Sequence, residues 1–93
     1  MNAKAKGARA EHKAMRILEA AGYSCVRAGG SLGMFDVIAM NEHGYKCLQV
    51  KSGGEYCSKI EREIMRECRV PSNCSREIWR FPDRCKAPLI EVL

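Results

Sequence analysis

Three polar residues interrupt two short apolar runs in the stretch FDVIAMNEHGYKCLQVKSG, which extends from Phe35 to Gly53. They are Asp36, Gln49 and Lys51. A charge inside an otherwise buried strand is costly unless it is paired with an opposite charge, bound to a metal ion or directed into a cleft. The stretch therefore marks either an ion pair or a site that carries chemistry.

The pairing of the two apolar runs can be predicted by counting outward from the polar turn. If residues 41–44 form a four-residue hairpin loop, Met40 faces Tyr45 and Asp36 faces Gln49. Directly opposed residues have Cβ atoms about 5 Å apart on one face of the sheet, and Lys51 shares that face because strands alternate with a period of two. We therefore expect Asp36, Gln49 and Lys51 to converge.

The residues before this hairpin predict one helix and one strand. Residues 5–21 are rich in helix formers, and Gly22 is a natural stop. Residues 23–28 alternate like a half-buried strand, and the glycine-rich residues 29–33 interrupt them. The predicted buried face of the helix consists of Ala10, Ala14, Ile17, Leu18 and Ala21.

The residues after the hairpin predict a second helix and two strands. Ser58 and Glu61 have the spacing of a capping box, and Ile60, Ile64 and Cys68 mark one side of the helix that follows. Pro71 should end this helix. EIWRF at residues 77–81 and LIEVL at residues 89–93 are typical of strands.

The composition favours one compact domain that spans residues 1–93. With 93 residues, 46% of them hydrophobic, the chain has room for a single core. Sixteen Lys and Arg against eleven Asp and Glu give a formal charge of +5, which favours a polyanionic partner. No apolar run approaches the roughly 20 residues that span a bilayer, and the N-terminus lacks a signal-peptide core, so we expect a soluble, cytoplasmic protein without a membrane partner.

The cysteines do not form a recognisable framework. Thiols normally stay reduced inside cells, so we expect no disulfides. No close C-x-x-C pair is present among Cys57, Cys68, Cys74 and Cys85, which leaves a metal–thiolate site as an alternative to small buried or exposed thiols.

Taken together, the first helix, the glycine loop and the polar hairpin resemble the PD-(D/E)XK nucleases. Within that superfamily the chain is most similar to the archaeal-type Holliday junction resolvases, which share a KG…E opening helix, an AGGS-like loop and an Asp ahead of an ExK motif. Here these features are KGARAE at residues 6–11, AGGS at 28–31, Asp36, and QVK at 49–51. The resemblance implies an α/β fold with a restriction-endonuclease-like αβββαβ core, in which helices flank a mixed central sheet.

The resemblance also implies a metal-dependent DNA endonuclease with Mg²⁺ or Mn²⁺ as its cofactor. Asp36 would be the central ligand, joined by Gln49, the carbonyl of Val50 and Glu11, because hard oxygen atoms suit such ions. Lys51 would orient the attacking water or stabilise the charge that hydrolysis builds on the phosphate. A junction needs two symmetric cuts, so a homodimer is expected.

Contacts to the phosphates of branched or junction DNA are expected beside this site, with solubility as the alternative for the basic residues. The expected contact residues are Lys6, Arg9, Lys13 and Ser31. A phage or a mobile element is an expected origin for a resolvase of this kind. Ser31 could equally serve only in a turn.

Gln49 stands where the family usually has Glu. A neutral amide lends an oxygen atom but no charge, so the site is expected to bind a metal ion more weakly than one with Glu. One alternative function is therefore a non-catalytic nucleic-acid-binding module with a decayed nuclease site. Another interpretation of Asp36 and Lys51 is a simple ion pair on a solvated face.

Overall fold

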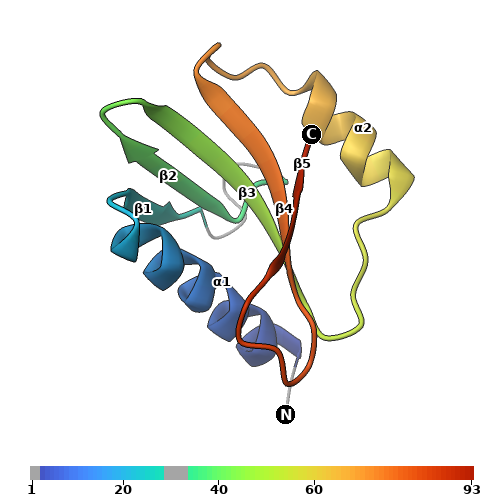
Figure 1. Ribbon diagram of the computed structural model, residues 1–93. Helices are drawn as coiled ribbons and strands as arrows, with labels where there is room; N and C mark the ends of the chain where they lie inside the picture. The colour runs from blue at the N-terminus through green and yellow to red at the C-terminus, as the bar shows by residue number, and fades with distance from the viewer. Residues whose placement is uncertain (1–2, 29–33) are drawn as a thin grey trace.

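The computed structural model describes residues 3–28 and 34–93, with side chains from residue 7 onward in the first range. Its elements follow the predicted order (Figure 1). They are α1 (Ala3–Ala20), β1 (Ser24–Arg27), β2 (Val37–Asn41), β3 (Gly44–Ser52), α2 (Lys59–Glu67), β4 (Cys74–Phe81) and β5 (Leu89–Val92).

One mixed sheet carries all five strands in the order β1-β2-β3-β4-β5. β3 and β4 are parallel, and the other neighbours are antiparallel. The chain therefore needs a crossover between β3 and β4, and α2 supplies it. Figure 1 shows α1 lying across β1, β2 and β3, with α2 on the other side of the sheet. The predicted α/β core with a mixed sheet between helices is confirmed.

The first helix ends through a glycine cap. Gly22 has φ 95°, a conformation that side chains with a Cβ atom rarely adopt. The Tyr23 amide donates to the Leu18 carbonyl and the Gly22 amide donates to the Glu19 carbonyl, each at 3.0 Å, which is the Schellman pattern. Ala10, Ala14 and Leu18 are buried as predicted. Ile17 and Ala21, which we expected on the same face, are exposed.

The β2–β3 hairpin has the predicted register but a tighter turn. Val37 pairs with Leu48 and Met40 pairs with Tyr45. Asn41 and Gly44, predicted as loop, form one further pair, so only residues 42 and 43 make the turn. The Asn41 side chain accepts hydrogen bonds from the amides of His43 (2.8 Å) and Gly44 (3.1 Å), which closes the turn in place of a longer loop.

The second helix begins at the predicted capping box, in which Ser58 and Glu61 exchange hydrogen bonds of 3.0 Å. The predicted apolar side of this helix is wrong. Ile60 and Ile64 are 69% and 46% exposed, whereas Met65 is fully buried. A helix of nine residues places only a narrow face on the sheet; Met65 is its buried residue, and Cys57 and Cys68, which lie just outside its two ends, pack in the same cluster.

Two apolar clusters lie on opposite faces of the sheet. On the α1 side, Leu48, Trp79 and Phe81 pack with the buried residues of the helix. On the α2 side, Phe35 and Ile78 pack with Met65. The sequence signal for β4 covered only residues 77–81, but the strand begins at Cys74, because residues 74–76 pair with residues 45–47 of β3. None of the described helices has the length and apolar character of a membrane span.

Candidate active site

Asp36 lies immediately before β2, and its backbone and side chain are both held by β3. The Asp36 amide donates to the Leu48 carbonyl at 2.8 Å, and the Val50 amide donates to Asp36 Oδ2 at 2.8 Å. Burial raises the pKa of Asp36, the Val50 hydrogen bond opposes that rise, and the charges of Glu11 and Glu55 add to it. The carboxylate is therefore held by β3, and its charge is repelled by those of two other carboxylates.

Glu11 reaches this neighbourhood from the middle of α1. Its Oε1 accepts a hydrogen bond of 2.7 Å from Arg27 Nε, which ties the helix to β1. The Glu11 side chain is 18% exposed, so it is not the fully solvated helix residue that its spacing alone would suggest. Sequence reasoning did not identify Arg27 as a partner of Glu11, although residue 27 lies near the end of the strand predicted at residues 23–28.

Lys51 is held by the start of α2. Its Nζ lies 3.0 Å from Glu61 Oε2, and the other oxygen of Glu61 caps the helix at Ser58. The Ser58 amide and the Lys51 ammonium lower the pKa of Glu61 to about 2. One carboxylate thus fixes both the helix start and the candidate catalytic amine.

Gln49 is nearly buried, at 8% exposed, and its side chain is directed toward the segment before α2. Its Oε1 accepts a hydrogen bond of 3.1 Å from the Cys57 thiol. Arg62 holds the Cys57 carbonyl and also forms a two-point ion pair with Glu91 of β5. Gln49 and Lys51 thus both contact the segment that opens α2, while the charge of Lys51 also acts on Asp36.

Two further residues at the site were missed by sequence reasoning. Glu55 accepts hydrogen bonds from the amide and hydroxyl of Ser52 at 3.1 and 3.0 Å, and its charge acts on Asp36. The S-x-x-E spacing of Ser52 and Glu55 was an available signal for this turn. Arg80 pairs with Lys51 in the parallel register of β3 and β4, which no hairpin count could reveal.

The oxygen atoms around Asp36 suit a hard divalent cation. Within the described ranges 3–28 and 34–93, no three His, Cys, Asp or Glu side chains are gathered tightly enough to hold a metal on their own. The predicted ligand set differs from such a cluster because it adds the Val50 carbonyl and the Gln49 amide to Asp36 and Glu11. A cation would offset the repulsion that Glu11 and Glu55 exert on the Asp36 charge, and the hard oxygen donors of the predicted set are of the kind that Mg²⁺ or Mn²⁺ prefers.

The predicted DNA contacts are only partly described. Arg9 and Lys13 are exposed on α1. The Lys6 side chain and the whole of Ser31 lie outside the described residues.

The thiols lend no support to the metal–thiolate alternative in the part of the chain that the structure describes. All six cysteines are free. Cys47 Sγ and Cys74 Sγ lie 3.1 Å apart, and burial, with the nearby thiols, raises the pKa of Cys47 to about 12. Cys57 is engaged by Gln49, and Cys85 is exposed.

Comparison with known proteins identifies the family of this chain. Residues 2–70 match the profile of the archaeal Holliday junction resolvases, Hjc. The structure is similar to that of Hjc, a Holliday junction resolvase from the archaeal hyperthermophile Archaeoglobus fulgidus, with a TM-score of 0.76 and 23% identity. The similarity covers 94% of this chain and 72% of the Archaeoglobus chain. No curated protein matches the sequence. The family profile spans most of the chain, and the chain therefore belongs to the archaeal Holliday junction resolvase family.

Proposed function

We propose that this protein is a metal-dependent DNA endonuclease that cuts Holliday junctions or other branched DNA. The observation that carries the proposal is the fixed position of Asp36. Its carboxylate is bonded to the Val50 amide at 2.8 Å and feels the charges of Glu11, Lys51 and Glu55, in a chain of the resolvase family.

The proposed ligands of the metal are Asp36, Glu11, the Val50 carbonyl and the Gln49 amide oxygen. A bound Mg²⁺ or Mn²⁺ would offset charge on the phosphate and acidify a water molecule. The protein contributes by keeping these oxygen atoms in place before the substrate arrives. The Val50 hydrogen bond does this for Asp36, and Arg27 does it for Glu11.

Lys51 supplies the positive charge that the reaction needs outside the metal site. Its ammonium group can donate hydrogen bonds to a phosphate oxygen or to the attacking water. Glu61 limits the positions that the flexible lysine side chain can take, because the capping box holds the Glu61 carboxylate. Such restriction lowers the cost of reaching the reactive geometry.

We further propose that the protein acts inside the cell as a homodimer. A Holliday junction has two strands to cut at symmetric positions, and a twofold dimer presents two identical sites. Light scattering of the free protein and of its complex with junction DNA tests this step, and a monomer in both would contradict it.

A substrate panel tests the proposed activity. Purified protein is incubated with labelled junction, flap, single-stranded and duplex DNA in the presence of Mg²⁺, Mn²⁺ or a chelator. We expect metal-dependent cleavage that is strongest on the junction. Binding of the junction without cleavage under any metal condition would contradict the nuclease and favour the decayed binding module.

A further inference from the structure

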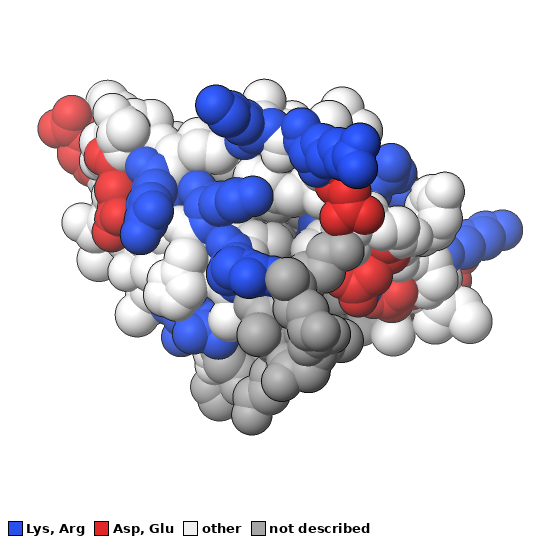
Figure 2. Space-filling model, turned by 90° about the horizontal axis from the view of Figure 1, so that it is seen from below, with Lys and Arg blue, Asp and Glu red and all other residues white. Residues whose placement is uncertain are grey.

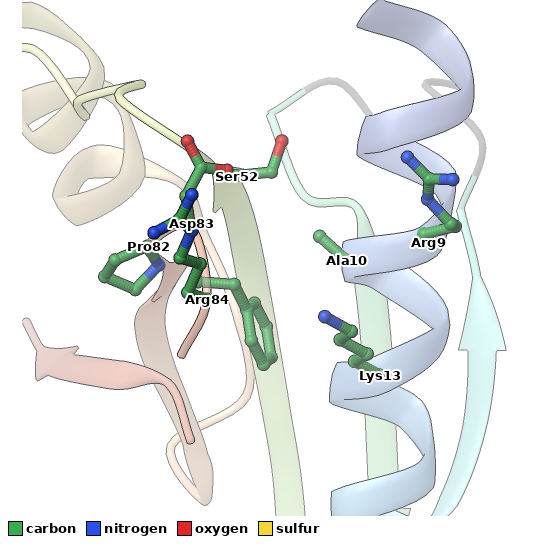
Figure 3. Close-up of a pocket in the computed structure, with 8 residues that line it drawn as sticks. Arg9, Ala10, Lys13, Ser52, Pro82, Asp83 and Arg84 are labelled. Atoms are coloured by element: carbon green, nitrogen blue, oxygen red, sulfur yellow. The ribbon is translucent and has the colours of Figure 1, made fainter. Parts of the chain in front are cut away.

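A pocket of about 350 Å³ lies between α1 and the loop that joins β4 to β5 (Figure 3). We call it the basic pocket. Figure 3 shows Lys13 extending from α1 toward this gap, with residues of the β4–β5 loop on the far side. Its side chains come from three separate segments. They are Arg9, Ala10 and Lys13 of α1, Ser52 at the end of β3, and residues 81–84 at the end of β4 and directly after it.

The basic pocket has a positively charged rim and a buried, largely apolar floor. Arg9, Lys13 and Arg84 contribute three cations to the rim, against the single carboxylate of Asp83. Ala10 and Phe81 on the floor are each 4% exposed. In Figure 2, which views this end of the molecule, Lys and Arg side chains gather near the middle of the face, with Asp and Glu to either side. An anion with an apolar group attached fits such a pocket.

The basic pocket adjoins the candidate active site through two of its own residues. Ser52 directly follows Lys51 in β3, and Ala10 directly precedes Glu11 in α1. Because neighbouring residues of a strand point to opposite faces, the pocket lies on the α1 side of the sheet while Lys51 contacts α2. The chain adjacency of Ala10 to Glu11 and of Ser52 to Lys51 nevertheless puts the pocket next to the candidate active site, so DNA bound at that site would pass close to the pocket.

We propose that the basic pocket binds a backbone phosphate, with its deoxyribose, of the same strand that the active site cuts. This inference rests on the proposed function, and it adds Arg84 to the DNA contacts expected from the sequence. The phosphate would lie among the cations of the rim, and the sugar would cover Ala10 and Phe81. The contact reads no base, so it should act equally on all sequences.

The backbone of Arg84 supports a role for its side chain. Arg84 has φ 65°, and among the described residues it is the one non-glycine with a positive φ. Glycine adopts this conformation without the strain that a Cβ atom causes. A strained arginine at the rim of a cationic pocket is expected where the side chain itself is used.

The test measures junction binding as a function of salt in the presence of a chelator, so that no cleavage occurs. Arg84→Gln removes the charge and keeps a side chain at the strained position. We expect about tenfold weaker binding and a salt dependence, as log K against log salt, that is shallower by about one unit. Arg69→Gln is the matched control, because Arg69 is exposed in the segment that precedes β4, whereas Arg84 follows this strand, and the salt slope of the control should equal that of wild type. Equal slopes for Arg84→Gln and wild type would overturn the proposal.

A second variant separates DNA binding from a purely structural role. Arg84→Gly relieves the positive φ, so its melting temperature should equal or exceed that of wild type while its junction binding falls as in Arg84→Gln. Normal binding by Arg84→Gly would overturn the pocket as a phosphate site.

Failure of the proposed function has a different signature from failure of the pocket. If wild type binds but does not cut with Mg²⁺, the nuclease is wrong, and the salt slopes still decide the pocket. If wild type cuts the junction and the Arg84 variants bind as wild type does, the pocket is wrong and the nuclease stands.

Discussion

Asp36 is the residue at which stability and function are expected to conflict. Burial, together with Glu11 and Glu55, raises the pKa of Asp36 above that of an unfolded chain. The folded state therefore favours the protonated form, and this contribution to stability is complete below the unfolded pKa of 3.8 and is lost as the pH rises through the folded pKa. At neutral pH without metal, the ionised carboxylate destabilises the fold.

The first prediction at the residue scale is that Asp36→Asn stabilises the metal-free protein. An asparagine oxygen can still accept the Val50 hydrogen bond, but it adds no charge beside Glu11 and Glu55. We expect a melting temperature a few degrees higher at pH 7 and a smaller difference near pH 3, as active-site charges commonly reduce stability. Thermal unfolding with a chelator at both pH values checks this. A lower melting temperature for the variant at pH 7 would show that the ionised form is stabilising.

Gln49 has a partner that the sequence did not suggest. It accepts a hydrogen bond from Cys57 and is almost buried, so a carboxylate in its place would be costly without a cation. Gln49 nevertheless lies in β3 directly before Val50, whose amide holds the Asp36 carboxylate. Its role as a ligand stays a prediction.

The second prediction at this scale concerns the metal requirement. Gln49→Glu should lower the Mg²⁺ concentration for half-maximal cleavage by about tenfold, because an added negative charge near the ion outweighs its desolvation by one or two kcal/mol. Gln49→Ala should raise that concentration. Titration of Mg²⁺ against cleavage rate compares the three proteins. If Gln49→Ala needs no more metal than wild type, Gln49 is not a ligand.

At the scale of elements, the cap of α2 also holds the side chain of Lys51. Ser58 and Glu61 cap the helix, and Glu61 also holds the Lys51 ammonium at 3.0 Å. Two substitutions can separate these roles. Ser58→Ala removes the cap and leaves the carboxylate, whereas Glu61→Gln keeps a capping side chain and removes the charge.

We predict that these two variants fail in different ways. Ser58→Ala should lose about 1 kcal/mol of unfolding free energy and cleave almost as wild type well below its melting temperature. Glu61→Gln should lose less stability but cleave about tenfold more slowly, because Lys51 is no longer held. Denaturant unfolding and single-turnover cleavage measure both effects. Equal cleavage by Glu61→Gln and wild type would mean that Glu61 serves only the helix.

The order of elements and the hairpin register could be predicted because they depend on local patterns. Counting from the polar turn gave the pairs from Val37–Leu48 to Met40–Tyr45, and the capping box gave the start of α2. The buried face of α2 could not be predicted, because it depends on how a short helix lies on the sheet.

The site residues that were missed share a different cause. Arg80 is the neighbour of Lys51 in the parallel pairing of two strands that a crossover separates, and Arg84 lines a pocket with residues of α1 that lie far from it in the sequence. Neither contact can be predicted from the spacing of residues within one local segment of the sequence. The Cys57 partner of Gln49 likewise depends on the path of the loop before α2.

At the scale of the whole molecule, one buried carboxylate joins the parallel strands at the centre of the sheet. Glu77 is 2% exposed, and its carboxylate accepts hydrogen bonds from Lys46 (2.6 Å), Ser75 (2.8 Å) and Trp79 (2.9 Å). Burial alone would raise the pKa of Glu77, but these donors together lower it. Its contribution to stability is thus present above the unfolded pKa of 4.5 and is lost as the pH falls through the lower folded pKa.

We predict that Lys46→Met destabilises the protein by about 2–3 kcal/mol at pH 7, because it leaves a buried charge without its counterion. The pKa of Glu77 should then rise, so acidification toward pH 4 should narrow the difference from wild type. The double variant Lys46→Met, Glu77→Leu should recover part of the loss. Denaturant unfolding at the two pH values provides the check, and a difference independent of pH would contradict this account of the pair.

The central claim is that Asp36 organises a site that hydrolyses junction DNA. The most direct measurement is single-turnover cleavage of a labelled Holliday junction with Mg²⁺ by wild type, Asp36→Asn and the control Glu42→Gln, which changes an exposed turn residue of the same hairpin. We predict cleavage by wild type and Glu42→Gln, and none by Asp36→Asn although it folds and binds the junction. Cleavage by Asp36→Asn at the wild-type rate would contradict the account.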